Sequence, residues 1–179
     1  GLLYEFGANF AKARKALLSE VEQALVELSA QLPQMVVDSL REQVARIKAL
    51  SEDILALEKR LGQQLRQDPK MQRIAQIPGV GLLTATAAIA TMGEASAFKS
   101  GREFCAWLGL VPKQNGTGGK VRLGSISKRG DTYLRTLLIH GARSVLTHTK
   151  EPGPWLEGLK GRRPANVVVV AQAAKMART

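Results

Sequence analysis

A repeat of apolar residues before one proline most constrains how the N-terminal part of this chain can fold. Leucine and valine recur there at spacings of three and four residues in turn, at Leu18, Val21, Leu25, Leu28 and Leu32. This spacing predicts a helix over residues 8–32 with a narrow apolar stripe of the coiled-coil type. Proline cannot continue a helix, so Pro33 should end it.

A second, longer helix is expected over residues 34–67, and it carries two apolar seams. The first seam runs through Val37, Leu40, Val44 and Ile47, and the second through Leu50, Ile54, Leu57 and Leu61. Asp68 should end the helix, because Pro69 drives the preceding residue out of the helical region. Two long helices joined at a proline predict an antiparallel coiled-coil arm over residues 1–69. Because such narrow stripes leave apolar surface without a partner, we expect the arm to form a homodimer rather than a monomeric spacer.

The charge of the chain is concentrated in its C-terminal part. The whole chain has 26 basic and 15 acidic residues, a net charge of +11. Residues 1–98 hold 11 of each sign, whereas residues 99–179 hold 15 basic and 4 acidic residues and carry the entire excess. A basic surface that served only solubility would spread this excess over both parts. The distribution therefore favours a face within residues 99–179 that binds nucleic acid.

A proline- and glycine-rich turn, "IPGVG" over residues 77–81, precedes a helix of small residues expected over 82–92. Helix, glycine turn and helix form the pattern of a helix-hairpin-helix element. Backbone N–H groups at the start of the second helix can hold a phosphate without reading a base, which makes Gly79, Val80 and Gly81 candidate contacts. The alternative is a tight corner between helices in which glycine supplies a positive φ.

Three more helices are expected, over residues 101–110, from about 131 to about 148, and from 164 onward. The first should turn Phe104, Trp107 and Leu108 inward. Asp131 is a suitable N-cap for the second, and Pro164 suits the first position of the third. The expected fold class is therefore all-α, with the arm followed by a small helical domain over residues 70–179.

Residues 112–130 are rich in glycine, hydroxyl and basic side chains. Glycine lets a backbone approach another chain closely, and basic side chains neutralise phosphates. We expect a loop that lies against a nucleic-acid backbone, with phosphate contacts from Lys113, Lys120, Arg122, Lys128, Arg129 and Arg135. The hydroxyls of Thr117, Ser125 and Ser127 are candidate nucleophiles for a phosphodiester, because basic neighbours would stabilise the developing charge. Alternatively, these hydroxyls hydrogen-bond phosphate or cap a helix.

Composition argues against several other kinds of site. The single Cys105 excludes an internal disulfide framework and a cysteine-based zinc site. No metal or cofactor is expected in this chain, because residues 99–179 hold few carboxylates and His140 and His148 are too far apart for a helical zinc pair. No apolar run reaches the length of a membrane span. We therefore expect a cytoplasmic protein with no membrane partner.

Three motifs in succession resemble a known family. They are "IPGVG", "FKSGREFCAWLGLVP" and "GGKVRLGSISKRGDTYLRTLLIHGAR". Together they look like the C-terminal domain of the DEDD-type insertion-sequence transposases, the RNA-guided (bridge RNA or seekRNA) recombinases related to Piv-type DNA invertases. The resemblance covers residues 77–146.

This resemblance implies several properties. The family protein has an N-terminal RuvC-like domain with Asp and Glu ligands for magnesium, a domain that this chain is expected to lack. A coiled-coil linker joins the two domains, and dimers pair into larger synaptic complexes on DNA. The implied partners are DNA and a guide RNA, in the nucleoid. A serine of the C-terminal domain attacks DNA to form a covalent intermediate.

The chain departs from the family pattern at that serine. Where relatives read like "SSGGK", this sequence has Gly116, Thr117 and then "GGK". Thr117 is the first candidate to replace the serine, ahead of Ser127 and Ser125. If one of these hydroxyls acts, the chain takes part in serine-type strand exchange. If none does, it is a non-catalytic module for nucleic-acid binding and dimerisation, or an architectural protein that binds DNA junctions.

Overall fold

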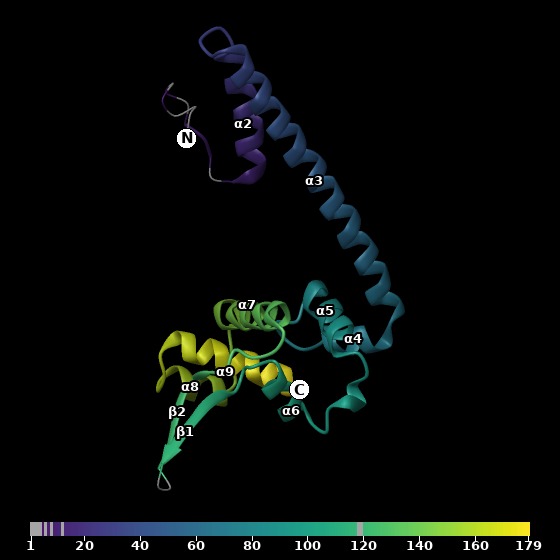
Figure 1. The fold of residues 1–179 in the computed structure, drawn as a ribbon, viewed down its shortest axis with the longest axis vertical. Helices are drawn as coiled ribbons and strands as arrows, with labels where there is room; N and C mark the ends of the chain where they lie inside the picture. Colours follow the sequence, from purple (N-terminus) through teal and green to yellow (C-terminus); the bar gives the residue numbers. More distant parts are fainter. Residues whose placement is uncertain (1–4, 6, 8, 12, 118–119) are drawn as a thin grey trace. The chain divides into compact units, whose positions relative to one another are not determined.

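The computed structural model describes residues 5, 7, 9–11, 13–117 and 120–179 (Figure 1). The chain divides into two compact units, Gly1–Lys59 and Arg60–Thr179. Most of the described residues are helical, and one small sheet has two strands. In the part of the chain that is described, no helix is both long enough and apolar enough to cross a membrane.

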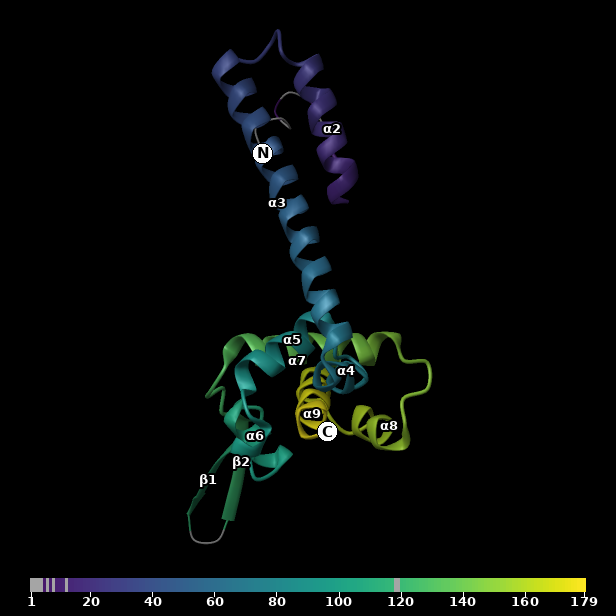
Figure 2. The same ribbon diagram turned by 90° about the vertical axis from the view of Figure 1, so that its right-hand side faces the viewer.

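The first unit is built on helix α2 (Arg14–Glu27) and the beginning of helix α3 (Gln34–Gln67), which lie side by side in Figures 1 and 2. Leu25, Leu32 and Val37 are buried together, with the partly buried Phe10 against them. Outside this core, Lys48 of α3 forms an ion pair with Glu22 of α2. The two helices therefore form a short hairpin through the first apolar seam.

Helix α2 is shorter than the expected helix over residues 8–32. After Glu27 the chain turns, and the Ser29 N–H and hydroxyl both bond to the Val26 carbonyl. This local competition for a helix carbonyl ends α2 before Pro33 is reached. In contrast, α3 has the bounds that its sequence predicts.

The two seams of α3 differ in their surroundings. In the first seam, Val37 is fully buried and Val44 is 7% exposed. In the second, Leu50, Ile54 and Leu57 are each about half exposed, at 52, 48 and 53%. The intrachain hairpin thus covers the first seam as far as Val44, whereas Ile47 at its end is 38% exposed. A long coiled-coil arm stays a prediction.

The second unit is a small helical domain with a β-hairpin (Figure 2). Its remaining helices are α4 (Pro69–Ala75), α5 (Leu82–Met92), the 3-10 turn η1 (Ala95–Ala97), α6 (Gly101–Trp107), α7 (Thr132–His148), α8 (Pro154–Lys160) and α9 (Ala165–Arg178). Its strands are β1 (Pro112–Thr117) and β2 (Lys120–Ile126). The expectation of an all-α fold is therefore wrong for residues 112–126, and the fold is mostly helical with one two-stranded sheet.

Side-chain caps set several of these helix starts. The Asp68 carboxylate accepts hydrogen bonds from the backbone N–H groups of Lys70 and Met71, so this residue ends α3 and caps α4. The Asp131 carboxylate accepts from the Leu134 N–H and caps α7 as its sequence predicts. Pro164 lies one residue before α9 rather than at its first position. Helix α8, which the sequence interpretation missed, starts at Pro154.

The core of the second unit is aliphatic, as the low aromatic content requires. Helices α7 and α9 cross through it, and it is formed mainly by Val80, Ala85, Ala88, Cys105, Leu108, Leu110, Leu134, Leu138, Ala142, Val169, Ala173 and Met176. Trp107 was expected in this core but is 39% exposed. Its ring instead stacks on Phe104 and meets Phe98 edge-on, so the three aromatic rings form their own cluster beside α6.

Candidate nucleic-acid interface

The predicted phosphate-binding loop is a β-hairpin followed by a short connector. Strands β1 and β2 run antiparallel, with Asn115 opposite Arg122 and Gly116 opposite Val121. Directly opposed residues share a face of a sheet, so the two pairs lie on opposite faces. Lys113, Lys120 and Arg122 are all exposed. The hairpin therefore presents cationic side chains from both strands.

The connector, residues 127–131, continues from β2 to the cap of α7 and is tied to the segment after α6. The Ser127 N–H donates to the Val111 carbonyl at 2.8 Å, and the Lys128 N–H donates to the Gly109 carbonyl at 3.0 Å. Lys128 has a φ of 56°, a left-handed conformation that is uncommon for a residue with a side chain. The surrounding bonds must hold it there.

Two glycines let the connector lie directly against the end of α6. A Cβ built on Gly109 would lie 2.2 Å from the Arg129 carbonyl oxygen. A Cβ on Gly130 would lie 1.8 Å from the Trp107 carbonyl oxygen. Both glycines also have positive φ, so no other residue fits either position. This backbone contact fixes the connector while the side chains of Lys128 and Arg129 stay exposed.

Arg135 does not lie on this exposed face. Its residue is only 7% exposed, and its guanidinium bonds to two backbone carbonyls, those of Leu108 at 3.0 Å and Arg129 at 3.1 Å. A third bond runs to the Thr132 hydroxyl at 3.1 Å. The guanidinium of Arg135 thus faces acceptors inside the fold, and a phosphate contact by Arg135 stays a prediction that its burial does not favour.

The structure separates the three candidate hydroxyl residues. The backbone of Thr117 ends β1 and is paired with Lys120. Ser125 is exposed on β2, and Ser127 is partly buried at the start of the connector. Within the described ranges, no group of three or more His, Cys, Asp or Glu residues could hold a metal ion. The hairpin thus brings cations and hydroxyl-bearing residues together, and the question of which hydroxyl reacts stays open.

The "IPGVG" turn connects α4 to α5 and packs against α7. Gly79 has a φ of 88°, and a Cβ on it would lie 2.7 Å from the Gly141 carbonyl oxygen. The Val80 N–H already donates to the Ile77 carbonyl at 2.9 Å, and Val80 is buried. Gly81 is exposed at the start of α5. These contacts favour the corner interpretation for Gly79 and Val80, so the helix-hairpin-helix element stays a prediction.

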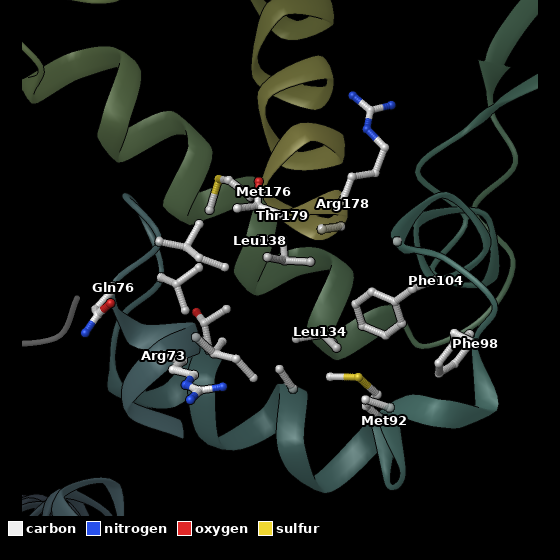
Figure 3. A pocket seen from close by; sticks show the side chains of 18 of the residues that line it. Arg73, Gln76, Met92, Phe98, Phe104, Leu134, Leu138, Met176, Arg178 and Thr179 are labelled. Atoms are coloured by element: carbon white, nitrogen blue, oxygen red, sulfur yellow. The ribbon is translucent and has the colours of Figure 1, made fainter. Parts of the chain in front are cut away.

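A groove of about 670 Å³ lies between α4, α5, α7 and α9 (Figure 3). Apolar side chains such as Met92, Leu138 and Met176 form most of its lining, and Arg73 and Arg178 also line it. None of the residues 112–131 is among its lining. The groove is therefore a separate apolar feature rather than part of the cationic hairpin.

Cys105 is not a nucleophile in this fold. Its residue is fully buried, and burial raises the pKa of the thiol above its ordinary value of 9.0, with the nearby Arg178 acting in the opposite direction. The neutral thiol is the form present near pH 7. Cys105 therefore packs as a small apolar side chain, as its sequence context predicts.

Sequence reasoning missed the hairpin and the buried position of Arg135. A signal for the hairpin was present, since Val121 and Leu123 alternate with polar residues after the glycine-rich tip. No such signal distinguishes Arg135 from the other five basic residues proposed as phosphate contacts. Only the fold shows that its charge faces two carbonyls.

Comparisons with known proteins show which family the segment that contains the hairpin resembles. Residues 71–154 match the family model described as "Transposase IS116/IS110/IS902 family". This segment, which includes the hairpin and the connector, therefore has the sequence pattern of IS110/IS116-family transposases.

Curated relatives extend the similarity to nearly the whole chain. The "Probable family 20 transposase" of Pseudomonas aeruginosa is 46% identical over 99% of this chain and 54% of its own length. The "Transposase for insertion sequence element IS1111A" of Coxiella burnetii is 37% identical over 99% of this chain and 50% of its own. The corresponding transposase for IS1328 of Yersinia enterocolitica is 36% identical, over 98% and 53%. The chain thus spans about half the length of these relatives.

Proposed function

We propose that this chain is the C-terminal part of a DNA transposase, and that its hairpin and connector bind the phosphates of DNA. One observation carries the proposal: a segment that matches the transposase family presents Lys113, Lys120, Arg122, Lys128 and Arg129, all exposed, and contains no acid between Lys113 and Gly130. Phosphate contacts position a protein on DNA without reading its sequence. A cationic two-stranded ribbon is also narrow enough to enter a major groove.

The test is the salt dependence of DNA binding. A variant with alanine at Lys120, Arg122, Lys128 and Arg129 should bind a 30-base-pair duplex more weakly. The slope of log affinity against log salt should become shallower by about 0.9 for each phosphate that the variant no longer neutralises. If all four side chains contact phosphate, the total change in slope is between about three and four. Fluorescence anisotropy at several salt concentrations measures this slope.

A matched control carries alanine at Lys59, Arg60, Arg66 and Lys70. All four are exposed on α3 or α4, and their removal changes the net charge by the same amount. The control should retain most of the slope. If both variants bind equally weakly, DNA affinity depends only on the total charge of the chain, and the hairpin has no special role in binding.

The finer proposal concerns chemistry. In a full-length protein with a magnesium-binding RuvC-like domain, a hydroxyl of the hairpin would attack phosphorus. A bond from the hydroxyl oxygen to phosphorus would form as a bond to a deoxyribose oxygen breaks, with the hydroxyl proton finally taken up by the leaving oxygen. Exposed Lys120 and Arg122 are near enough in sequence to stabilise the added charge. Thr117 is the first candidate because it occupies a family serine position.

Two further parts of the proposal rest on the family resemblance: a guide RNA as a second nucleic-acid partner and a location at the nucleoid. A third part, a homodimer formed through the arm, rests on the apolar seams as well as on the resemblance. The half-exposed second seam of α3 supports the dimer. A non-catalytic DNA-binding module is the alternative function, and the presence of Gly116 and Thr117 at the two serine positions favours it.

A further inference from the structure

The buried guanidinium of Arg135 joins two segments that are distant in sequence. The Leu108 carbonyl belongs to the end of α6, and the Arg129 carbonyl belongs to the connector. Both accept from the same nitrogen, Nη1, while Nη2 donates to the Thr132 hydroxyl. The planar fork of arginine reaches these acceptors at once, which the single ammonium of lysine does not reproduce.

The connector contains a strained backbone conformation, at Lys128, that needs surrounding contacts to persist. The left-handed conformation of Lys128 is strained for a residue with a side chain, and such strain persists only where surrounding contacts impose it. The bonds from Lys128 to Gly109 and from Arg135 to the Arg129 carbonyl lie on either side of this strained residue. Without Arg135, only the bond to Gly109 would remain of these two.

The connector also carries charges that suit an anion. Among the described residues, no carboxylate forms an ion pair with Arg135, and the Asp131 carboxylate, four residues earlier in the chain, caps α7. Lys128 and Arg129 add two exposed positive charges to the connector, whose Arg129 carbonyl accepts from Arg135. A phosphate at the connector would neutralise these exposed charges.

We propose that Arg135 is a positioning residue that holds Lys128 and Arg129 in a preformed pair of phosphate contacts without touching DNA itself. This inference rests on the proposed DNA-binding function. It goes beyond that function because it makes the phosphate affinity of the exposed Lys128 and Arg129 depend on a buried side chain. It predicts that Arg135 acts on DNA only through the two exposed cations.

The first experiment tests the bridge in the free 179-residue chain. Arg135→Gln should speed amide hydrogen exchange at Lys128 about tenfold or more, because glutamine cannot reach both carbonyls and the neighbouring backbone opens more often. Arg143→Gln is the matched control, since Arg143 is exposed on the same helix and its replacement changes the charge equally. If amide exchange at Lys128 is unchanged in Arg135→Gln, Arg135 does not hold the connector in place, and this result does not depend on what the chain binds.

The second experiment tests the link to DNA with a double-mutant comparison on the 30-base-pair duplex. In the unmodified chain, Arg135→Gln should weaken binding about tenfold and lower the salt slope by up to about two. In a chain that already carries Lys128→Ala and Arg129→Ala, the same change should have little further effect. An equal weakening in both backgrounds would overturn the positioning role, because Arg135 would then act directly or through general stability.

Thermal melting followed by circular dichroism shows whether Arg135→Gln is folded. If it is not, Arg135→Lys keeps the charge and part of the hydrogen bonding, and should show intermediate exchange and affinity. Binding by Arg135→Lys equal to that of the unmodified chain would contradict the need for the fork. If the unmodified chain does not bind the duplex at all, the proposed function fails together with the positioning role, even where the exchange result supports the bridge.

Discussion

Gly79 and Gly141 touch backbone to backbone, where the turn between α4 and α5 meets α7. A Cβ on Gly141 would lie 2.0 Å from the Gly79 carbonyl oxygen and 3.3 Å from the Met176 methyl group. The first neighbour is backbone and cannot withdraw, whereas the second is the end of a flexible side chain that can shift. The contact fixes the position of α5 against α7.

Gly141→Ala should therefore destabilise the chain by about 1–3 kcal/mol, as overpacking of a filled core does. Helix propensity alone predicts the opposite sign, since alanine favours a helix by about 1 kcal/mol over glycine. Urea unfolding followed by circular dichroism measures the difference. Gly158→Ala in α8 is the control: its Cβ would meet only the flexible Arg162 guanidinium, at 3.9 Å, and the change should stabilise. Stabilisation by Gly141→Ala would show that the contact is not tight.

The arm offers a second prediction, which separates its two seams. Leu25→Glu should destabilise the hairpin of α2 and α3, because Leu25 is 1% exposed and a buried charge there has no partner. Leu57→Glu should instead leave the helix content unchanged and weaken the proposed homodimer by about tenfold or more, because it places a charge in the second seam. Sedimentation velocity gives the oligomer, and circular dichroism gives the helix content.

Ala56→Glu is the control for the dimer, since it adds the same charge to a neighbouring exposed position of α3. It should leave the oligomer as it is. If Leu57→Glu sediments like the unmodified chain, the second seam does not form the dimer.

A third prediction concerns the hydroxyls. In a full-length protein that contains this chain, Thr117→Ala should abolish a covalent protein–DNA adduct while DNA affinity stays within about twofold, if Thr117 is the nucleophile. Thr117→Ser should restore or increase the adduct, because threonine is stiffer and more crowded at its β-carbon. Denaturing gel electrophoresis and mass spectrometry identify the adduct and its residue.

Ser125→Ala and Ser127→Ala provide the comparison. A hydroxyl that only binds phosphate should lower affinity when removed yet leave an adduct detectable at high protein concentration. An adduct that survives all three substitutions rules out this set of hydroxyls. An adduct that appears only when serine replaces Gly116 or Thr117 identifies the chain as a catalytically inactive relative.

The fourth prediction follows from the raised pKa of Cys105. The folded state holds the thiol proton more tightly than the unfolded chain, so the stability from this group is constant below about pH 9 and declines as the pH rises further. Iodoacetamide at pH 8 should modify the native chain about a hundredfold more slowly than the chain in urea, because reaction requires an opening of the core. Fast modification of the native chain would contradict the buried position. Cys105→Ser controls for modification elsewhere.

The elements that sequence reasoning predicted correctly have strong periodicity and clear boundaries. Helix α3 has two apolar seams and ends at Gln67, just before Asp68 and Pro69, and α7 begins after the cap residue Asp131. Local chemistry determines these ends. Helix α2 was overextended because the spacing of leucines continues through a turn that the Ser29 side chain stabilises.

The hairpin and Trp107 could not be placed in the same way. Val121 and Leu123 alternate with polar residues, but apart from Ile126 the residues of β1 and β2 with a described burial are exposed on both faces. The alternation therefore has no buried face to support it. The open end of the hairpin is held by a hydrogen bond from the Ser127 N–H to the carbonyl of Val111, which is distant in sequence. Trp107 lies outside the core, where its ring contacts Phe98, a residue that precedes α6 in the chain. Arg135 was assigned by its charge alone, whereas its burial depends on carbonyls from two other segments.

A sheet of only two strands has no interior strand, so each strand of the hairpin offers a free row of peptide groups to any extended chain. Such edges readily recruit a third strand from another molecule, and charged residues along them, lysine above all, oppose that recruitment. Lys113 lies on one strand, and Lys120 and Arg122 lie on the other. The same cations that suit phosphate therefore protect the ribbon from self-association. Variants without them need a check for aggregation before any change in DNA affinity is interpreted.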